Sequence, residues 1–387
     1  MVLEVDFPPD VRVENEIQLL DDLGISVDLA CYTFGKTTIE KYRNSTVYKF
    51  HLSWLMYKFK ALAMELPFYH IYWKKRINRV LDKGNYTILH IHDLPLARVG
   101  WKLRKKYRFT LITDYHENRP AIMPFYSYVR NFPGKYLISV KRWEQYQRRA
   151  CIETDRLVVV TPEARQYYVD RYKIRTDKIF VLSNYVNVNQ ISNFKIDKEI
   201  TSKYKDRNVF LYFGETGIRR GTLDILRVAK ELKDTCPANV FTIIGSSAEQ
   251  HLLENYKESE NLQNVELLGY IPIEKAVSYM SIAYAGLCPF HRNDHHDTTY
   301  ANKMFQYMYF GVPIIASNCI AQMKVIEDSN CGYTFKSGNI EEFAGVVKKI
   351  TEDVDERNQL GQNGKQSVLS GYNWNNQKSV IKRLYDF

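Results

Sequence analysis

Short apolar segments alternate with helical patterns along most of this chain of 387 residues. The segments that fit buried β-strands are 3–5, 27–30, 87–91, 110–113, 157–160, 179–182, 209–213, 240–244, 265–268, 285–288 and 313–316. Helical patterns lie between them, among others at 14–22, 223–232 and 303–309. Alternation at this spacing is typical of parallel sheets that are covered by helices on both faces. The sequence therefore predicts an α/β protein with two doubly wound sheets.

The strand-like segments fall into two sets that are separated by a polar stretch at 184–192. We interpret this stretch as a linker and expect two facing Rossmann-like domains, with the boundary at residue 186. In doubly wound sheets, ligands bind at the carboxyl ends of the strands. The loops that follow the strands are therefore the places to look for function.

The composition excludes several classes of protein. Hydrophobic residues make up 45% and charged residues 25%, the balance of a globular protein and not of a disordered chain or a collagen-like fibre. The six cysteines form no Cys-x-x-Cys pair, and several stand in apolar runs, which indicates reduced, buried thiols in a cytoplasmic protein. We expect neither a membrane span nor a cleaved secretion signal, since no apolar run reaches about 18 residues.

The net charge of +10 is unevenly distributed. Residues 1–185 contain 31 Lys and Arg against 20 Asp and Glu, whereas the remainder of the chain has a net charge of −1. Within 51–150 the counts are 20 basic and 6 acidic residues. This asymmetry suggests that one half meets an anionic surface and the other a discrete ligand.

Residues 46–81 interleave aromatic and basic side chains. One interpretation is a set of core-facing helices with a solvated basic face, broken or kinked at Pro67. The other is a peripheral membrane surface, where aromatic rings enter the interface and lysines meet anionic head groups. We expect no nucleic-acid partner, because no nucleic-acid-binding motif accompanies the segment.

Two polar clusters follow neighbouring strands of the first half. His90-Ile-His92-Asp93 ends one strand and Asp114-Tyr-His116-Glu117 ends the next, so both should reach one edge of one sheet. A satisfied structural role is the alternative for any single histidine here. His90 and His92 share one face of a strand, but no third ligand stands at a typical spacing, and we expect no metal site.

In the second half, Phe213-Gly-Glu-Thr-Gly-Ile-Arg-Arg-Gly221 follows a strand and opens a helix. Glycines, a helix N-terminus and two arginines suit a diphosphate, although an exposed basic turn would look similar. The stretch 289–317 joins a polar loop to a helix that ends at Gly311, before Pro313 opens the next strand. We expect its loop and helix start to hold a nucleotide's phosphates and Gln306 to face the ribose, although a solvated loop before an ordinary core helix would look similar.

The order of these segments resembles the GT-B glycosyltransferases of the family 4 type, which include bacterial enzymes that build lipopolysaccharide, capsule and other surface glycans. The likeness rests on Asp10-x-Arg-Val13, His92-Asp93, His116-Glu117, Val159-Val-Thr-Pro162, Leu182-Ser-Asn184, Arg220-Gly221, Leu268-Gly269 and Asn302-Lys303…Tyr307-Met308…Gly311-x-Pro313. Tyr372-Asn-Trp374 and the helix after it look like the family's C-terminal segment, which crosses back onto the first domain.

The resemblance implies a metal-independent, retaining transfer from a nucleotide sugar, with UDP or GDP as the nucleotide and no further cofactor. It implies an acceptor domain over 1–186 with the helix 372–387, and a nucleotide-sugar domain over 187–371. The residues that it places at the site are His116, Glu117, Arg219 and Arg220 as catalytic groups; Gly214, Gly221, Gly245, Tyr270, Thr298, Thr299, Asn302, Lys303 and Gln306 for the donor; and Arg12, His92 and Asp93 for the acceptor.

Three positions depart from the family pattern. Thr298 and Gln306 stand where many members have glutamates, and Glu215 stands where many have an arginine. A glycosyltransferase on the inner face of the plasma membrane, acting on a glycan or lipid-linked acceptor, is the function that we expect. The alternatives are a catalytically silent partner protein of the same fold and a sugar-nucleotide epimerase.

Overall fold

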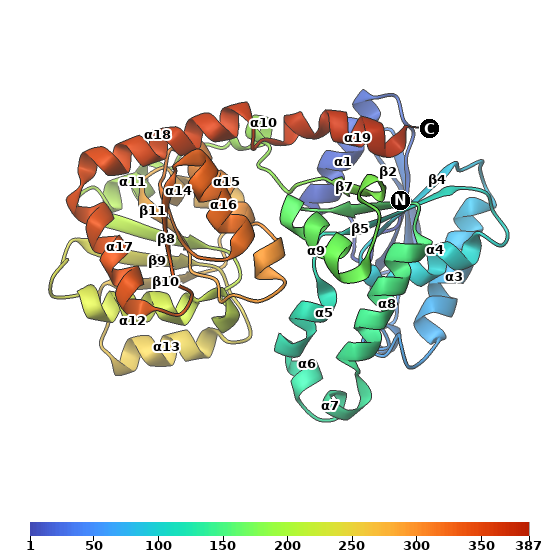
Figure 1. Ribbon diagram of the computed structural model, residues 1–387, viewed down its shortest axis with the longest axis horizontal. Helices are drawn as coiled ribbons and strands as arrows, with labels where there is room; N and C mark the ends of the chain where they lie inside the picture. Colours follow the sequence, from blue (N-terminus) through green and yellow to red (C-terminus); the bar gives the residue numbers. More distant parts are fainter. Residues whose placement is uncertain (387) are drawn as a thin grey trace. The chain divides into compact units, whose positions relative to one another are not determined.

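The computed structural model describes residues 1–386, which divide into two compact units (Figure 1). Unit 1 contains residues 1–183 together with the C-terminal residues from Gln377 onwards. Unit 2 contains residues 184–376. The division falls between Ser183 and Asn184, where the sequence analysis expects it at residue 186.

The sheet of unit 1 is built from two parts. One part has the strand order β1-β3-β2 and the other the order β4-β5-β6-β7. The strands are β1 (Asp28–Thr33), β2 (Thr38–Tyr42), β3 (Ser45–His51), β4 (Ile88–His92), β5 (Thr110–Tyr115), β6 (Arg156–Val159) and β7 (Ile179–Val181). The pairs are parallel, except that β2 and β3 form an antiparallel hairpin.

Val2 joins these two parts. It forms parallel bridges to Ala30 of β1 and Ile91 of β4. Its backbone N–H donates to His90 at 2.8 Å, and its carbonyl accepts from His92 at 3.0 Å. The strand predicted at 3–5 is therefore wrong: the segment forms bridges at Val2, too briefly for a named strand.

Helices cover unit 1 on both faces (Figure 1). They are α1 (Val11–Asp22), α2 (Trp54–Lys58), α3 (Phe68–Leu81), α4 (Ala97–Leu103), α5 (Arg119–Ile122), α6 (Ser127–Arg130), α7 (Gly134–Leu137), α8 (Val140–Glu153), α9 (Pro162–Tyr172) and α19 (Lys378–Tyr385). The C-terminal helix α19 lies beside α1 in this unit, as the fold prediction requires. The Arg156 guanidinium of β6 donates to the carbonyl of Leu384 and so helps to hold α19 in place.

Residues 46–81 are not the run of helices that the first interpretation expects. They begin inside strand β3, whose hairpin with β2 the sequence analysis missed. Helix α3 starts directly after Pro67 and buries Tyr69, Trp73 and Ile77, so this part is core-facing. The short helix α2 has no buried residue.

Unit 2 contains a six-stranded parallel sheet in the order β10-β9-β8-β11-β12-β13. Its strands are β8 (Asn208–Phe213), β9 (Asn239–Ile244), β10 (Val265–Gly269), β11 (Ala283–Cys288), β12 (Ile314–Ser317) and β13 (Gly332–Phe335), the last of which was not predicted. Its helices are α10 (Val188–Ile191), α11 (Lys198–Lys203), α12 (Thr222–Leu232), α13 (Gln250–Ser259), α14 (Ile273–Met280), α15 (Asn302–Tyr309), α16 (Ile320–Ser329), α17 (Ile340–Glu352) and α18 (Val354–Ser370). The predicted linker at 184–192 carries α10 and belongs to this unit.

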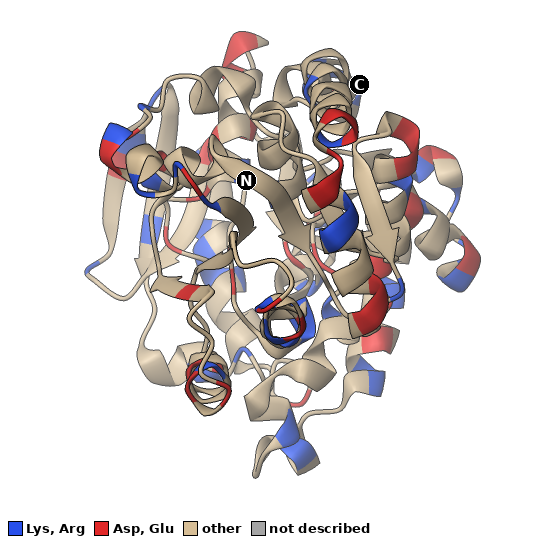
Figure 2. Cartoon of the chain, turned by 90° about the vertical axis from the view of Figure 1, so that its left-hand side faces the viewer, with Lys and Arg blue, Asp and Glu red and all other residues tan. Residues whose placement is uncertain are grey.

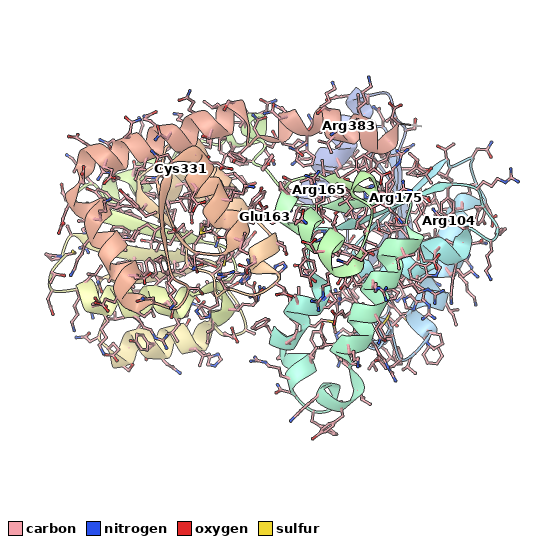
Figure 3. The ribbon with its side chains drawn as sticks, viewed as in Figure 1. Arg104, Glu163, Arg165, Arg175, Cys331 and Arg383 are labelled. Atoms are coloured by element: carbon pink, nitrogen blue, oxygen red, sulfur yellow. The ribbon has the colours of Figure 1, made fainter. Side chains whose placement is uncertain are left out.

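All six cysteines are free, and all except the half-buried Cys236 are buried, as the composition suggested. Cys331, labelled in Figure 3, is buried in unit 2, directly before β13.

Several helices carry both acidic and basic residues, as the red and blue segments of Figure 2 show. Within residues 1–386, none of the helices combines the length and the apolar character that crossing a bilayer demands.

Candidate active site

Strands β4 and β5 bring the two polar clusters of unit 1 together. They pair in parallel, with His92 opposite Asp114, so the residues that follow them leave the sheet at the same edge. The backbone N–H of Asp93 donates to the carbonyl of Asp114 at 3.0 Å and ties the two strand ends to each other. The predicted meeting of these clusters at one sheet edge is confirmed.

Asp93 contacts His116 across this edge. One carboxylate oxygen of Asp93 lies 3.4 Å from Nε2 of His116, and both side chains are partly exposed. Asp93 has a φ of +72°, a conformation that costs a non-glycine residue free energy and that clusters at functional sites. Burial lowers the pKa of His116, but the carboxylates of Asp93, Asp114 and Glu117 together outweigh it and raise the pKa overall.

A second cluster lies beneath this pair, in the core of unit 1. It consists of Glu16, His90, His92 and Asp114, all buried, with ligand atoms within 4.8 Å of one another. Arg12 lies between the two carboxylates, with its guanidinium 2.6 Å from Asp114 and 3.2 Å from Glu16. The carboxylates come from distant parts of the chain, which is why spacing around His90 and His92 did not show them.

The dimensions of the cluster are those of a metal site, but its geometry suits an ion-pair network better. The rings of His90 and His92 stack with centroids 4.3 Å apart and an angle of 25° between them. Lone pairs of imidazole nitrogens lie in the ring plane, so two stacked rings do not aim at a common point. Arg12 already places a cation beside both carboxylates, and the hydroxyl of Tyr385 contacts Nδ1 of His90.

Burial controls the protonation of this network. It raises the pKa of Glu16 to about 8, against the opposing effect of Arg12, and it lowers the pKa of both His90 and His92 well below the usual value. Glu16 is then protonated at neutral pH and the two histidines are uncharged. The ion pair of Arg12 with Asp114, at 2.6 Å, lies beside these three groups.

The three residues predicted to bind the acceptor lie at different depths. The guanidinium of Arg12 contacts Asp114, Glu16 and the carbonyl of Leu182. The side chain of His92 is completely buried. Asp93 is partly exposed. Acceptor binding by Arg12 and His92 stays a prediction, whereas the contacts of Arg12 hold Asp114 in place at the end of β5.

In unit 2, a side chain would collide with neighbouring backbone at two of three predicted glycines, Gly221 and Gly245. Gly214, Gly221 and Gly245 all have positive φ. A Cβ at Gly221 would lie 1.8 Å from the carbonyl oxygen of Pro289, and one at Gly245 would lie 1.7 Å from the carbonyl oxygen of Gly214. These loops can therefore approach each other, and a ligand, only as bare backbone.

The two predicted arginines share one carboxylate. Glu215 accepts from Arg219 at 2.8 Å and from Arg220 at 3.2 Å. Arg219 also donates to Nε2 of His296 at 3.1 Å, while Nδ1 of His296 lies 2.7 Å from the carbonyl of His291. Burial lowers the pKa of His296 to about 3, so its ring is neutral and accepts from the arginine. The sequence analysis noticed Glu215 as a departure but missed that it holds both cations.

Lys303 completes this group of cations. It lies at the start of α15 with its ammonium 3.4 Å from the centre of the Tyr212 ring and 5.2 Å from that of Phe290. Arg220 lies 4.9 Å from the same Phe290 ring. Burial lowers the pKa of Lys303 to about 7. A bound anion would favour the protonated, charged form of this side chain.

Thr298 and Gln306, the two positions where the family pattern has glutamates, differ in their hydrogen bonds. Thr298 donates its hydroxyl to the carbonyl of Asp294 at 2.6 Å, and Thr299 donates to that of His295 at 2.8 Å. The carboxylate of the neighbouring Asp297 pairs with Arg292 and accepts a hydrogen bond from the backbone N–H of Ile320. These hydrogen bonds direct the hydroxyls of Thr298 and Thr299 to neighbouring carbonyls, and the carboxylate of Asp297 to Arg292 and a backbone N–H.

Gln306 keeps its amide oxygen buried without a hydrogen-bond partner among residues 1–386. A buried acceptor in this state gains from a donor such as a ribose hydroxyl. Asn302 is exposed at the helix start, and Tyr270 is exposed beyond β10. The donor roles predicted for these residues stay predictions.

Two family models together span most of the chain. Glycosyltransferase Family 4 matches residues 10–190, and Glycosyl transferases group 1 matches residues 193–367. The chain is a family 4 glycosyltransferase with the GT-B fold.

The proteins that this glycosyltransferase resembles differ widely from it in sequence. An uncharacterised glycosyltransferase of Methanocaldococcus jannaschii is 20% identical over 97% of this chain and 93% of its own length. Sucrose-phosphate synthase of Thermosynechococcus elongatus is 19% identical, with a TM-score of 0.75 over 97% of this chain and 91% of that chain. HepE of Anabaena in complex with UDP is 13% identical, with a TM-score of 0.69 over 99% and 98%.

Proposed function

We propose that this glycosyltransferase transfers a sugar, with retention of configuration, from a UDP- or GDP-sugar to a glycan or lipid-linked acceptor in bacterial surface polysaccharide synthesis. The observation that carries the proposal is the cationic group of unit 2, Arg219, Arg220 and Lys303 around Glu215 and Phe290. Three cations and one carboxylate leave a formal charge of +2 when Lys303 is protonated. That charge complements a nucleoside diphosphate.

Stabilisation of the leaving diphosphate is the main catalytic effect in this proposal. Negative charge develops on the diphosphate as the bond to the sugar breaks, and cations that are already in place lower the barrier. These side chains supply the charge that a metal ion would supply elsewhere, so the proposal includes neither a metal nor another cofactor. Uracil as the base is supported by HepE, which is in complex with UDP.

His116 takes the position beside the transferred sugar in this proposal. Its contact with Asp93 and its raised pKa favour the protonated ring, which can donate a hydrogen bond to a sugar oxygen. Glu117, next in the chain, adds a carboxylate at the same edge and helps to raise that pKa. The acceptor then binds to unit 1, at the strand ends that carry these residues.

The exposed residues of unit 1 support an acceptor at the inner membrane surface. Trp54 and Leu55 of α2 are 64% and 63% exposed, and the Lys58 ammonium lies 3.4 Å from the centre of the Trp54 ring. Aromatic rings with lysines are typical of membrane interfaces. Vesicles that contain phosphatidylglycerol should pellet the protein at low salt, and failure to pellet would contradict membrane association.

Thermal unfolding with nucleotides tests the donor site. A ligand at about 100 times its dissociation constant raises the free energy of unfolding by about 2.7 kcal/mol, which a melting curve resolves. We expect UDP or GDP to raise the melting temperature and Arg220→Met to abolish the rise, while the exposed Arg207→Met leaves it unchanged.

A catalytically silent protein is the second candidate, favoured by the hydrogen bond that the Thr298 hydroxyl donates to the carbonyl of Asp294. It would bind a nucleotide without releasing it from a nucleotide sugar.

A further inference from the structure

Unit 1 contains an apolar pocket next to the strand ends that carry His116. Its volume is about 640 Å³, within the range of pockets that hold small organic ligands. The walls come from the segment 57–62 and from the segment 126–138 with its two short helices. Leu62, Leu137 and Ile138 provide aliphatic surface, and Tyr126 and Tyr128 stack on each other with centroids 5.3 Å apart.

Three cations line the same pocket, namely Lys58, Lys60 and Arg119. Lys60 pairs with the buried carboxylate of Glu4 at 2.8 Å. Arg119 lies over the ring of Trp143, and its Nε–H has no hydrogen-bond partner in the part of the chain that the structure describes. Three cations and one carboxylate leave a formal charge of +2 in a pocket that is otherwise apolar.

The pocket opens beside exposed apolar side chains. Leu137 of α7 lines the pocket and is 50% exposed, and its neighbours Phe132 and Tyr136 are 85% and 77% exposed. On the other wall, Tyr57 and Lys58 belong to α2, which also exposes Trp54 and Leu55. Figure 1 shows α6 and α7 at the lower end of unit 1, away from α1 and α19. Aromatic side chains together with lysines are enriched on surfaces that contact membrane–water interfaces.

Arg119 connects the pocket to the reacting centre. It begins α5, three residues after His116, on the loop that leaves the end of β5. An anion held by Arg119 would therefore lie on the side of the pocket that faces the site residues of unit 1. A chain bound among Leu62, Leu137 and Ile138 would extend from that anion toward the exposed apolar rim.

We propose that this pocket binds a membrane lipid acceptor, with its phosphate or diphosphate at Lys58, Lys60 and Arg119 and its apolar chain along the aliphatic wall. The inference rests on the proposed function and specifies its acceptor. Charge complementarity selects an anionic lipid, because an uncharged glycan would leave the net positive charge of the pocket uncompensated. The apolar wall selects a lipid over a free phosphate, because burying an alkyl chain against it removes apolar surface from water.

Binding of a short lipid phosphate tests the proposal without any donor. We would titrate the protein with farnesyl diphosphate, farnesol and inorganic pyrophosphate by calorimetry, and compare Leu137→Asp with Leu369→Asp. Leu369 is an equally exposed leucine, 52% against 50%, but it lies on α18 of unit 2. A second pair, Lys58→Glu and Lys36→Glu, reverses one charge at the pocket and one at an exposed loop of the same unit.

Farnesyl diphosphate should bind at least about tenfold more tightly than either of its parts, and Leu137→Asp and Lys58→Glu should each weaken it by about tenfold. The two control variants should bind it as the parent protein does. Equal binding of pyrophosphate and farnesyl diphosphate, absence of binding, or insensitivity to both pocket substitutions would overturn the proposal. A nucleotide-induced rise in melting temperature tests the donor site separately, so the two failures can be told apart.

Discussion

The carboxylate of Asp93 lies 3.4 Å from Nε2 of His116, and Asp93 adopts a φ of +72° in doing so. The hydrogen bond from its backbone to Asp114 fixes the strand end in this conformation. The backbone of Asp93 is therefore strained at the position where its carboxylate contacts His116. The pair is the most specific feature that unit 1 contributes to the proposed chemistry.

Replacing Asp93 by asparagine keeps the shape of the side chain and removes its charge. We expect the pKa of His116 to fall, because Asp93 is the carboxylate that contributes most to raising it. Proton NMR titration of the His116 ring measures this, with Asp170→Asn as the control at an exposed carboxylate of α9. An unchanged or higher pKa would show that Asp93 does not set the charge of His116.

Glu16 makes the stability of unit 1 depend on pH. Its pKa rises from 4.5 to about 8 on folding, so the folded state holds a proton that the unfolded state releases. Its contribution to stability is therefore present at low pH and is lost as the pH rises toward 8, with a slope of up to about 1.4 kcal/mol per pH unit.

Glu16→Gln should remove this part of the pH dependence. Urea unfolding at several pH values between 5 and 8.5 measures it, with the exposed Glu258→Gln as the control. The free energy of unfolding of the parent protein should decline more steeply than that of Glu16→Gln. Parallel curves for the two proteins would contradict the assignment.

Lys303 predicts that nucleotide binding is coupled to proton uptake. With a pKa lowered to about 7 it is largely uncharged above that pH, and a bound diphosphate favours the charged form. Affinity for UDP should fall between pH 7 and 9, by at most about tenfold per pH unit. Calorimetry should show this for the parent protein and for the exposed Lys275→Met, but Lys303→Met should bind weakly at every pH. A pH-independent affinity of the parent protein would exclude the coupling.

Substitutions of Gly221 and Gly338 distinguish the cost of a steric clash from the cost of a positive φ. Both have φ near +75°, at +72° and +78°, but a Cβ at Gly338 meets open space whereas one at Gly221 meets Pro289. Gly338→Ala should cost about 1 kcal/mol of stability, and Gly221→Ala about 2 to 3 kcal/mol more. Denaturant unfolding compares the two. Equal losses would mean that the Gly221 loop can move away from Pro289.

The sequence predicted the parts of the fold that local patterns encode. Strands such as β5 and β8 are short apolar runs with polar residues directly after them, and Gly311 and Pro313 mark the end of α15 and the start of β12. The position of Val2 between β1 and β4 was missed because a single bridging residue has no periodicity. The hairpin of β2 and β3 was missed because its turn at Arg43 lacks an Asn-Gly signal.

For the candidate site, too, local features could be predicted from the sequence, whereas long-range contacts could not. The ends of the strands could be predicted from the sequence, and with them the positions of His116 and Arg220 in the loops that follow. The partners of these residues come from pairing over long distances: Glu16 joins His90 through α1, and His296 joins Arg219 from a loop 77 residues away. Spacing cannot reveal such contacts. Nor can it show that the hydroxyl of Thr298 donates to the carbonyl of Asp294.

Release of nucleotide from UDP- and GDP-sugars is the most direct test of the central claim that the cations of unit 2 hold a departing diphosphate. The parent protein and Arg207→Met should release UDP or GDP from one class of sugar donor, at a rate that rises when membrane lipid is added. Arg220→Met should release it at least about a hundredfold more slowly. Equal rates for Arg220→Met and the parent protein, or no release from any nucleotide sugar with lipid present, would contradict the account.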